Sequence, residues 1–345
     1  MPSRRKIIIG TAVLAAAGFG ASRLMREEPP VQRPDGVPVS NFDDSLTAEG
    51  VTAGLDLTGK TALVTGANSG LGYETMRVLA MRGATVIGTG RTMEKAQRAC
   101  DSIGGETIPA VLELTDFDSV VACAEAGRSL NRPIDILVLK GGVMALPELE
   151  QVYGLEMQFV INHLGHFLLT NLLLDRVVAA PAGRIVVVSS SALKWADETA
   201  IEWDNLSGER DYDPNRFYGQ SKLANALFSL ELSKRLAGTN ATSNSMNPGA
   251  VLTNLQRHAP EWAIKLGEWI GPAFMKSPAE GATTICYLAA HPQVEGVSGH
   301  YFIDCNPVSL GGNSENRQLA SRLWDVSTEL TSDYLSTGTS GAAAV

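Results

Sequence analysis

The sequence has few of the residues that mark metal proteins, disulfide scaffolds or nucleic-acid-binding proteins. Its four cysteines are scattered without metal-ligand or disulfide spacing and are expected to be small buried side chains: Cys100, Cys123, Cys286 and Cys305. The 28 Lys and Arg residues are outnumbered by 37 Asp and Glu residues, and the net charge of −9 argues against nucleic-acid binding. His163 and His166 have no further ligands nearby in the sequence, which favours packing or capping over a metal site. We therefore expect no metal.

The apolar content is sufficient for one large core, and no internal repeat interrupts it. Hydrophobic residues make up 44% of the 345 positions. Runs such as 185–188 are apolar throughout, as in strands buried on both faces of a parallel sheet, and they alternate with helical patterns such as 224–236. This alternation predicts an α/β fold, a single Rossmann-type doubly wound parallel sheet with helices on both faces.

The first 55 residues differ in character from the rest. Ser3-Arg-Arg-Lys6 precedes an apolar run at 7–21, which is short for a membrane span. Paired arginines before a mild apolar run resemble a twin-arginine export signal, and an uncleaved membrane anchor is the alternative. An anchored domain that faces the cytoplasm is also open, although the positive charge before the run opposes it. We expect a signal or anchor over 1–26 and a proline-rich, semi-extended linker over 27–55.

A glycine-rich turn stands between a predicted strand and a predicted helix. The apolar run at 61–64 leads into Gly66-Ala-Asn-Ser-Gly-Leu-Gly72, and an amphipathic pattern follows. Glycines let the backbone turn sharply and approach a pyrophosphate, whose charge then meets the helix N-terminus. This context indicates a dinucleotide-binding loop.

A phenol and an ammonium group are placed four residues apart in Tyr218-Gly-Gln-Ser-Lys222. On a helix the two side chains share one face. A nearby cation favours the phenolate form of a tyrosine, so the pair suits proton exchange with an alcohol or carbonyl oxygen.

Five motifs in order resemble the short-chain dehydrogenase/reductase family, closest to its retinol dehydrogenase-like branch, over roughly 57–330. They are Thr65-Gly-Ala-Asn-Ser-Gly-Leu-Gly72, the segment at Asn162, Gly183-Arg-Ile-Val-Val-Val-Ser-Ser190, the Tyr218/Lys222 pair, and Asn247-Pro-Gly-Ala-Val-Leu-Thr253. The resemblance implies a catalytic domain over 56–335, followed by a flexible tail at 336–345.

The resemblance also implies roles for the catalytic residues. Tyr218 would exchange the proton, and Lys222 would lower the phenol's pKa and hold the nicotinamide ribose. Ser190 would bind the substrate oxygen, and Asn162 would position a water that relays protons to Lys222. Asn162 bridging backbone groups and Ser190 satisfying a strand end are the simpler structural alternatives.

The cofactor is expected to be NADP(H). Gly90 stands at the end of the second strand, where NAD-preferring members of the family carry an acidic residue, and Arg91 follows with a guanidinium suited to a 2′-phosphate. Glu113 replaces the aspartate that contacts adenine in the family. The expected cofactor-binding residues are Gly66, Asn68, Ser69, Gly70, Leu71, Gly72, Arg91, Glu113, Gly141, Tyr218, Lys222, Pro248, Gly249, Val251 and Thr253.

One motif departs from the family pattern. The family usually has Asn-Asn-Ala-Gly after the fourth strand, whereas this chain has Leu139-Lys140-Gly141-Gly142. The missing asparagine amides put the rigidity of the sheet in question. Lys140 either strengthens cofactor binding or points to solvent.

The substrate is expected to be a small lipophilic alcohol or carbonyl compound, such as a retinoid, steroid or fatty aldehyde. Trp195 and Trp203 lie in the long link between Ser190 and Tyr218, and 255–275 is rich in apolar and aromatic residues. These residues would form a lid or would simply pack that segment onto the body. A homo-oligomer through the helices bearing Asn162 and Tyr218 is a further expectation. A non-catalytic nucleotide-binding scaffold or redox sensor is the alternative function, because fold does not fix function.

Overall fold

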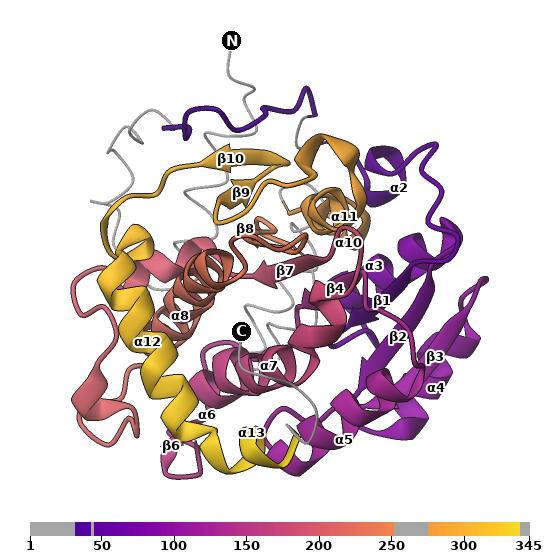
Figure 1. The fold of residues 1–345 in the computed structure, drawn as a ribbon. Coiled ribbons are helices and arrows are strands. Elements are labelled where there is room, and N and C mark those ends of the chain that lie inside the picture. Colours follow the sequence, from indigo (N-terminus) through magenta and orange to yellow (C-terminus); the bar gives the residue numbers. More distant parts are fainter. Residues whose placement is uncertain (1–31, 43–44, 252–274, 339–345) are drawn as a thin grey trace.

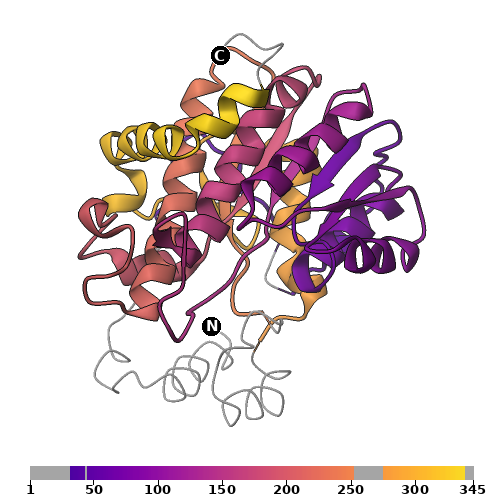
Figure 2. The same cartoon turned by 90° about the horizontal axis from the view of Figure 1, so that it is seen from below.

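The centre of the molecule is one eight-stranded sheet. A computed structural model describes residues 32–42, 45–251 and 275–338 (Figure 1). The strand order is β10-β9-β8-β7-β4-β1-β2-β3, parallel from β3 through to β9, with β10 antiparallel to β9. Helices cover both faces, as Figure 2 shows. The predicted doubly wound α/β fold is confirmed.

The strands are short. They are β1 (Thr61–Val64), β2 (Thr85–Gly90), β3 (Thr107–Val111), β4 (Ile136–Leu139), β7 (Arg184–Val188), β8 (Thr242–Asn247), β9 (Tyr301–Ile303) and β10 (Asn306–Val308), with a separate hairpin of β5 (Gln151–Val152) and β6 (Leu155–Glu156). Of these, β1, β2, β4 and β7 lie where apolar runs predict strands, whereas β8 is largely polar in sequence.

The main helices connect these strands. They are α2 (Ala48–Val51), α3 (Gly70–Met81), α4 (Met93–Asp101), α5 (Phe117–Ser129), α6 (Met157–Phe159), α7 (Gly165–Val178), α8 (Pro214–Arg235), α10 (Pro278–Gly281), α11 (Thr283–Ala290), α12 (Arg317–Leu330) and α13 (Ser332–Gly338). A π-helical stretch, η2 (Val160–Leu164), joins α6 to α7, and short 3₁₀ turns lie at η3 (Ser191–Ala196), η4 (Trp203–Asn205), η6 (Pro292–Val294) and η7 (Gly312–Glu315).

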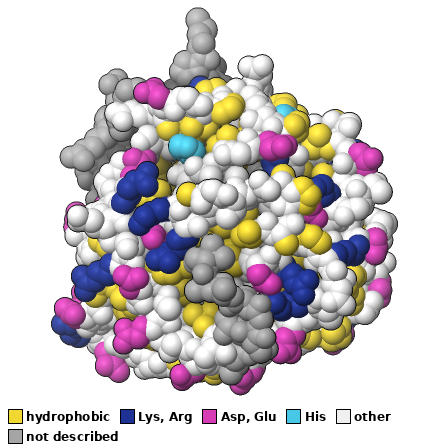
Figure 3. Space-filling model, viewed as in Figure 1, with side chains coloured by type: hydrophobic (Ala, Val, Ile, Leu, Met, Phe, Trp, Pro, Cys, Tyr) yellow, Lys and Arg dark blue, Asp and Glu magenta, His cyan; other side chains and the backbone are white. Residues whose placement is uncertain are grey.

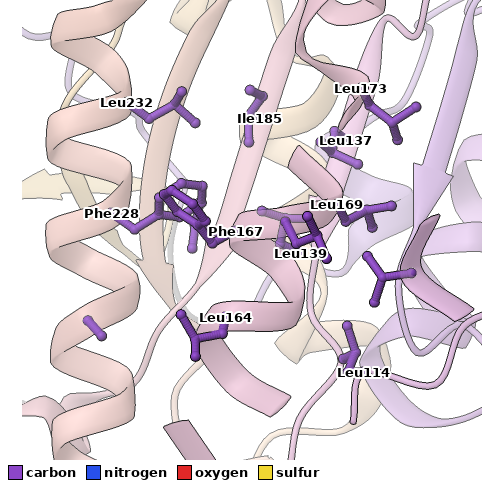
Figure 4. Close-up of a cluster of buried hydrophobic side chains, with 14 of the residues drawn as sticks. Leu114, Leu137, Leu139, Leu164, Phe167, Leu169, Leu173, Ile185, Phe228 and Leu232 are labelled. Carbon is purple, nitrogen blue, oxygen red and sulfur yellow. The ribbon is translucent and has the colours of Figure 1, made fainter. Parts of the chain in front are cut away.

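Two apolar cores lie on opposite faces of the sheet because successive strand residues point to opposite sides. In β4, Leu137 and Leu139 belong to the core under α5, α7, α8 and α12, which Figure 4 shows in part. Ile136 and Val138 belong to the core under α2, α3 and α11. Both faces of each central strand are therefore buried, which explains the uninterrupted apolar runs.

The chain reverses its direction of travel across the sheet between β1 and β4. These two strands pair in parallel, yet β2 and β3 lie on one side of them and β7, β8 and β9 on the other. In open α/β sheets ligands bind outside the carboxyl ends of the strands at such a switch point. Thr65 follows β1 there, and Lys140 follows β4.

The segment predicted to be a semi-extended linker is partly packed on the domain. Thr47 caps α2 by accepting a hydrogen bond from the Gly50 amide, and Ala48 and Val51 are buried in the core that contains α11. Further upstream, the Ser40 amide donates to Asn306 Oδ1 at 3.0 Å. Burial of these two apolar side chains stabilises the contact of α2 with the domain.

The C-terminal helix α12 covers the faces of α7 and α8. The ring of Trp324 lies 4.9 Å from that of Phe167 on α7 and 5.9 Å from that of Phe228 on α8. Helix α12 therefore covers the part of α7 and α8 around Phe167 and Phe228. A homo-oligomer was expected through the helices that bear Asn162 and Tyr218, the latter being α8. The last helix, α13, ends at Gly338, three residues beyond the expected domain boundary at 335.

Residues 7–21, on which the expectation of a signal or anchor rests, lie outside the described residues. Across the ranges that the structure describes, no helix combines the length and apolar character needed to cross a membrane.

Candidate active site

The sheet brings the expected site residues to one edge, beyond the carboxyl ends of its parallel strands. The glycine loop follows β1, Arg91 follows β2, Glu113 follows β3 and Gly141 follows β4. Ser190 follows β7, and Pro248, Gly249 and Val251 follow β8. Thr253 lies outside the described residues.

The glycine loop is packed too tightly to accept side chains at its key positions. A Cβ on Gly72 would lie 2.3 Å from the Gly66 carbonyl oxygen, and Gly66 has a positive φ of 63°. The Gly66 amide donates to Thr89 Oγ1 at 3.1 Å, which ties the loop to β2.

Helix α3 begins directly after this loop without a side-chain cap. Ser69 occupies the N-cap position in an extended conformation, and its hydroxyl accepts no hydrogen bond from the first turn. Asp116 and Asp213, by contrast, cap α5 and α8 with their carboxylates. Amides at the start of α3 are therefore available to an anionic group, as a bound pyrophosphate requires.

Residue 90 has no room for a carboxylate. A Cβ on Gly90 would lie 2.9 Å from the Ala96 backbone nitrogen at the start of the facing helix. The next side chain, Arg91, is exposed. Glu113 is half-buried, and its Oε1 accepts from the Thr115 amide and hydroxyl at 3.2 Å and 2.9 Å.

A hydrogen-bond chain stabilises the loop that lacks the family's asparagines. Thr65 Oγ1 accepts from the amides of Lys140 and Gly141 at 2.8 Å and 2.9 Å. The same hydroxyl lies 2.9 Å from His166 Nε2, and His166 Nδ1 lies 3.0 Å from the Asn162 carbonyl oxygen. A neutral ring that donates from Nδ1 and accepts at Nε2 satisfies every member of this chain. The rigidity lost with the two asparagines is thus supplied by Thr65 and His166.

Sequence reasoning assigned no role to Thr65 and only packing or capping to His166. The spacing of His166 from Asn162 is the one available signal, because residues four apart share a helix face. Burial lowers the pKa of His166 to about 4, which agrees with the neutral ring.

Asn162 lies in the π-helical stretch η2 and is fully buried. Its Oδ1 accepts from the Val143 amide at 2.9 Å, and its Nδ2 donates to the Val143 carbonyl at 3.0 Å and to Ser221 Oγ at 2.9 Å. Both amide protons are therefore used within the protein. Through these bonds Asn162 connects the loop after β4 to α8.

Helix α8 holds Tyr218 and Lys222 at the centre of the site. Asp213 accepts from the Arg216 amide at the start of the helix, Pro214 is the first helical residue, and Lys234 and Arg235 lie in the last turn. The Lys222 ammonium lies 5.6 Å from the centre of the Tyr218 ring and donates to the Val188 carbonyl at 3.4 Å. Ser190 accepts from the Ala192 amide at 3.2 Å, and its hydroxyl acts to lower the pKa of the Tyr218 phenol.

Burial controls the proton affinities of this pair. It raises the pKa of Tyr218 to about 12, and the Ser190 hydroxyl opposes that rise. Burial, and after it the positive charge of Lys140, together lower the pKa of Lys222 to about 7. Desolvation is the largest influence on the pKa of both groups.

The described part of the chain shows no group of three or more His, Cys, Asp and Glu side chains placed to hold a metal ion. A cavity of about 350 Å³ opens elsewhere, lined in part by Gly183, Arg184, Thr242 and Ser298. It lies at the amino ends of β7 and β8, opposite the edge that carries Ser190, so it is not part of this site.

Comparisons with known proteins agree with the geometry. The model of the short chain dehydrogenase family matches residues 60–202. Human retinol dehydrogenase 14 is 42% identical over 289 residues, covering 78% of this chain and 85% of that protein. The chain belongs to the short-chain dehydrogenase/reductase family, in its retinol dehydrogenase-like branch.

Solved structures place the fold in the same family. A protein from Mycobacterium paratuberculosis described as uncharacterized is 31% identical, with a TM-score of 0.66 over 82% of this chain and 97% of that one. A structure described as an NAD(P)-dependent gluconate 5-dehydrogenase from Beutenbergia cavernae, with bound NADP, is 25% identical, with a TM-score of 0.55 over 72% of this chain and 96% of that one. Membership identifies the chain as an oxidoreductase of alcohol and carbonyl groups that uses a nicotinamide dinucleotide, and the uncapped start of α3 fits that cofactor.

Proposed function

We propose that the protein is an NADP(H)-dependent oxidoreductase that interconverts a lipophilic alcohol and its carbonyl compound, with Tyr218 as the acid and base. The observation that carries the proposal is the burial of Tyr218 on α8 beside Lys222, whose ammonium lies 5.6 Å from the centre of the Tyr218 ring. It lies at the same sheet edge as the glycine loop.

The division of labour follows from the side chains. A bound nicotinamide supplies or accepts the hydride, so the protein must orient the substrate oxygen and move one proton. Tyr218 donates the proton during reduction and accepts it during oxidation. The Ser190 hydroxyl, which lowers the pKa of that phenol, orients the substrate oxygen. When protonated, Lys222 favours the phenolate form, and it also holds the nicotinamide ribose.

Asn162 supports this proton exchange, and we keep for it the role of positioning a relay water. Its Oδ1 accepts from the Val143 amide, and an amide oxygen has a second lone pair that can accept from a water. A Cβ on Gly142 would lie 2.7 Å from Asn162 Oδ1 and 3.8 Å from Lys222 Nζ, so the two side chains border one small region.

The preference for NADP(H) rests on Gly90 and Arg91. The contact between Gly90 and Ala96 leaves no room for a carboxylate that would repel a 2′-phosphate. The exposed guanidinium of Arg91 is the cation nearest in sequence to that position and suits a phosphate. A solved relative of similar fold carries NADP.

The lipophilic substrate class rests on Trp195 and on the relatives. The Trp195 ring lies 6.0 Å from the Tyr218 ring, and the residue remains 37% exposed beside the proton donor. An aromatic surface at that place favours an apolar substrate. Retinol dehydrogenase 14 is named for such a substrate. The apolar segment expected to form a lid lies mostly outside the described residues.

The N-terminal 26 residues are proposed to direct the domain to or across a membrane. The support is Arg4 and Arg5 ahead of the apolar run at 7–21. Export by a twin-arginine signal is favoured over an uncleaved anchor, because the short run is mild in hydrophobicity.

The decisive experiment compares the wild-type protein with Tyr218→Phe. Lipophilic aldehydes are mixed with NADPH, and loss of the reduced cofactor is followed by absorbance. We expect turnover for the wild type and a loss of at least a hundredfold in kcat for the variant, because general acid–base catalysis contributes roughly 10²–10⁴. NADPH should bind both proteins with similar affinity. A variant that keeps most of the wild-type rate would remove Tyr218 from the mechanism.

A further inference from the structure

Lys140 lies at the point of the fold where a dinucleotide is expected. It directly follows β4, beside the carboxyl end of β1, where the strand order reverses. Its amide and that of Gly141 are held by Thr65 Oγ1, the last side chain before the glycine loop. The backbone of Lys140 is thus fixed to the loop that approaches the cofactor.

The Lys140 side chain extends along the glycine loop. A Cβ built on Gly66 would lie 3.9 Å from Cδ of Lys140, so the aliphatic stem passes over Gly66. The residue is half-buried. Its charge lowers the pKa of both Lys222 and His166, as a cation in the neighbourhood of both side chains does.

Two independent features at this loop favour an anion. The start of α3 has no side-chain cap, so its first amides are available. The Lys140 and Lys222 ammonium groups repel one another, and an anion placed near them would relieve that repulsion. The anionic part of the dinucleotide that a glycine loop and a helix N-terminus bind is the pyrophosphate.

We propose that Lys140 is a cofactor-binding residue whose ammonium pairs with the pyrophosphate of the dinucleotide at the glycine loop. The proposal rests on the dinucleotide chemistry of the proposed function and adds a contact in place of the asparagines found in the family. It gives Lys140 and Arg91 different tasks. Lys140 contributes to the binding of any pyrophosphate, and Arg91 contributes only when a 2′-phosphate is present.

Binding measurements without substrate test this assignment. Lys140→Met keeps the stem and removes the charge, and Lys140→Arg keeps the charge. Lys234→Met is the matched control, because Lys234 lies in the last turn of α8 with a largely exposed side chain. Calorimetry with NADPH, NADH, ADP-ribose and adenosine gives the dissociation constants.

We expect Lys140→Met to weaken the binding of NADPH, NADH and ADP-ribose by a similar factor, roughly tenfold or more. Adenosine should bind as it does to the wild type, Lys140→Arg should recover most of the loss, and Lys234→Met should change little. The proposal is overturned by unchanged ADP-ribose binding, by an equal loss for adenosine, or by a loss confined to NADPH. Wild-type protein that binds ADP-ribose but reduces no aldehyde would contradict the proposed function and leave this assignment standing.

Discussion

Lys222 shows most directly how a functional residue opposes stability. The side chain is 5% exposed, and no carboxylate among the described residues forms an ion pair with it. Burial and the charge of Lys140 together lower its pKa to about 7 from 10.5. An unfolded chain therefore binds one more proton at this residue between those two pH values. The contribution of Lys222 to the free energy of unfolding therefore rises with pH between 7 and 10.5. It is lowest below pH 7, where both states are protonated.

Lys222→Met should consequently raise the melting temperature by several degrees at pH 6.5, while it abolishes turnover. Removing a desolvated charge is worth a few kcal/mol at most. The Val188 carbonyl is not left unpaired, because Asn225 Nδ2 also donates to it at 3.0 Å. Thermal unfolding at pH 6.5 and 9.5 measures the effect, which should shrink at the higher pH where the wild-type amine is neutral. A lower melting temperature for the variant at pH 6.5 would contradict this account.

Arg91→Ala should separate the two nicotinamide cofactors. A charge-assisted contact to one phosphate is worth roughly 1.5–3 kcal/mol, so NADPH affinity should fall about tenfold to a hundredfold. NADH affinity should change little, since NADH has no 2′-phosphate. Fluorescence titration with both cofactors checks this, and Arg98→Ala is a control on an exposed arginine of α4. Equal losses for NADPH and NADH would show that Arg91 does not bind the 2′-phosphate.

For single residues, the sequence predicts which side chains belong to the candidate site better than it predicts their hydrogen-bond partners. The spacing of Tyr218 and Lys222 is enough to place both on one face of α8. The compensation for the missing asparagines was not predictable, because Thr65, Lys140 and His166 lie on three separate elements. Only folding brings such distant residues within hydrogen-bond reach.

Helices with strong capping signals can be predicted from the sequence, whereas helices that depend on tertiary packing cannot. Helix α8 has a capping Asp213, Pro214 at its first position and two basic residues in its last turn. Helix α2 has only Ala48 and Val51 to bury, too few for a readable period, and it exists through its contact with α11. The π-helical stretch at Asn162 likewise has no sequence signature, since it is held by contacts to the loop after β4.

Helix α12 illustrates how an element can change an expected surface. A homo-oligomer was expected through the helices that bear Asn162 and Tyr218, the latter being α8. The structure instead places Trp324 of α12 on the rings of Phe167 and Phe228. The same aromatic area cannot be buried twice, so contact with a second copy through these rings requires α12 to leave. Figure 4 shows Phe167 and Phe228 side by side in the core under α5, α7, α8 and α12.

For the whole molecule, the net negative charge does not favour the binding of an anionic cofactor, so binding depends on local features. The chain carries a net charge of −9, and acidic and basic side chains are interspersed over the face shown in Figure 3. An anionic dinucleotide is thus not attracted by the molecule as a whole. It must be bound by local features, and the glycine loop, the start of α3, Arg91 and Lys140 are the ones that the fold gathers at a single edge.

The N-terminal segment is proposed to determine the compartment in which the whole molecule binds its cofactor. If Arg4 and Arg5 form a twin-arginine signal, changing both to lysine should leave the protein folded, active and in the cytoplasm. Lysine keeps the charge, so general membrane attraction and the orientation set by positive residues stay nearly unchanged. A receptor that recognises arginine is the factor that distinguishes the two proteins.

Fractionation of cells that carry either protein measures the outcome, with NADPH-dependent activity assayed in each fraction. An anchor formed by residues 7–21 predicts that the double-lysine protein stays in the membrane fraction as the wild type does. Export predicts a shift to the cytoplasm, with the folded domain retaining NADPH binding. An unchanged distribution would exclude the twin-arginine route and leave the anchor, because charge alone would then account for the location.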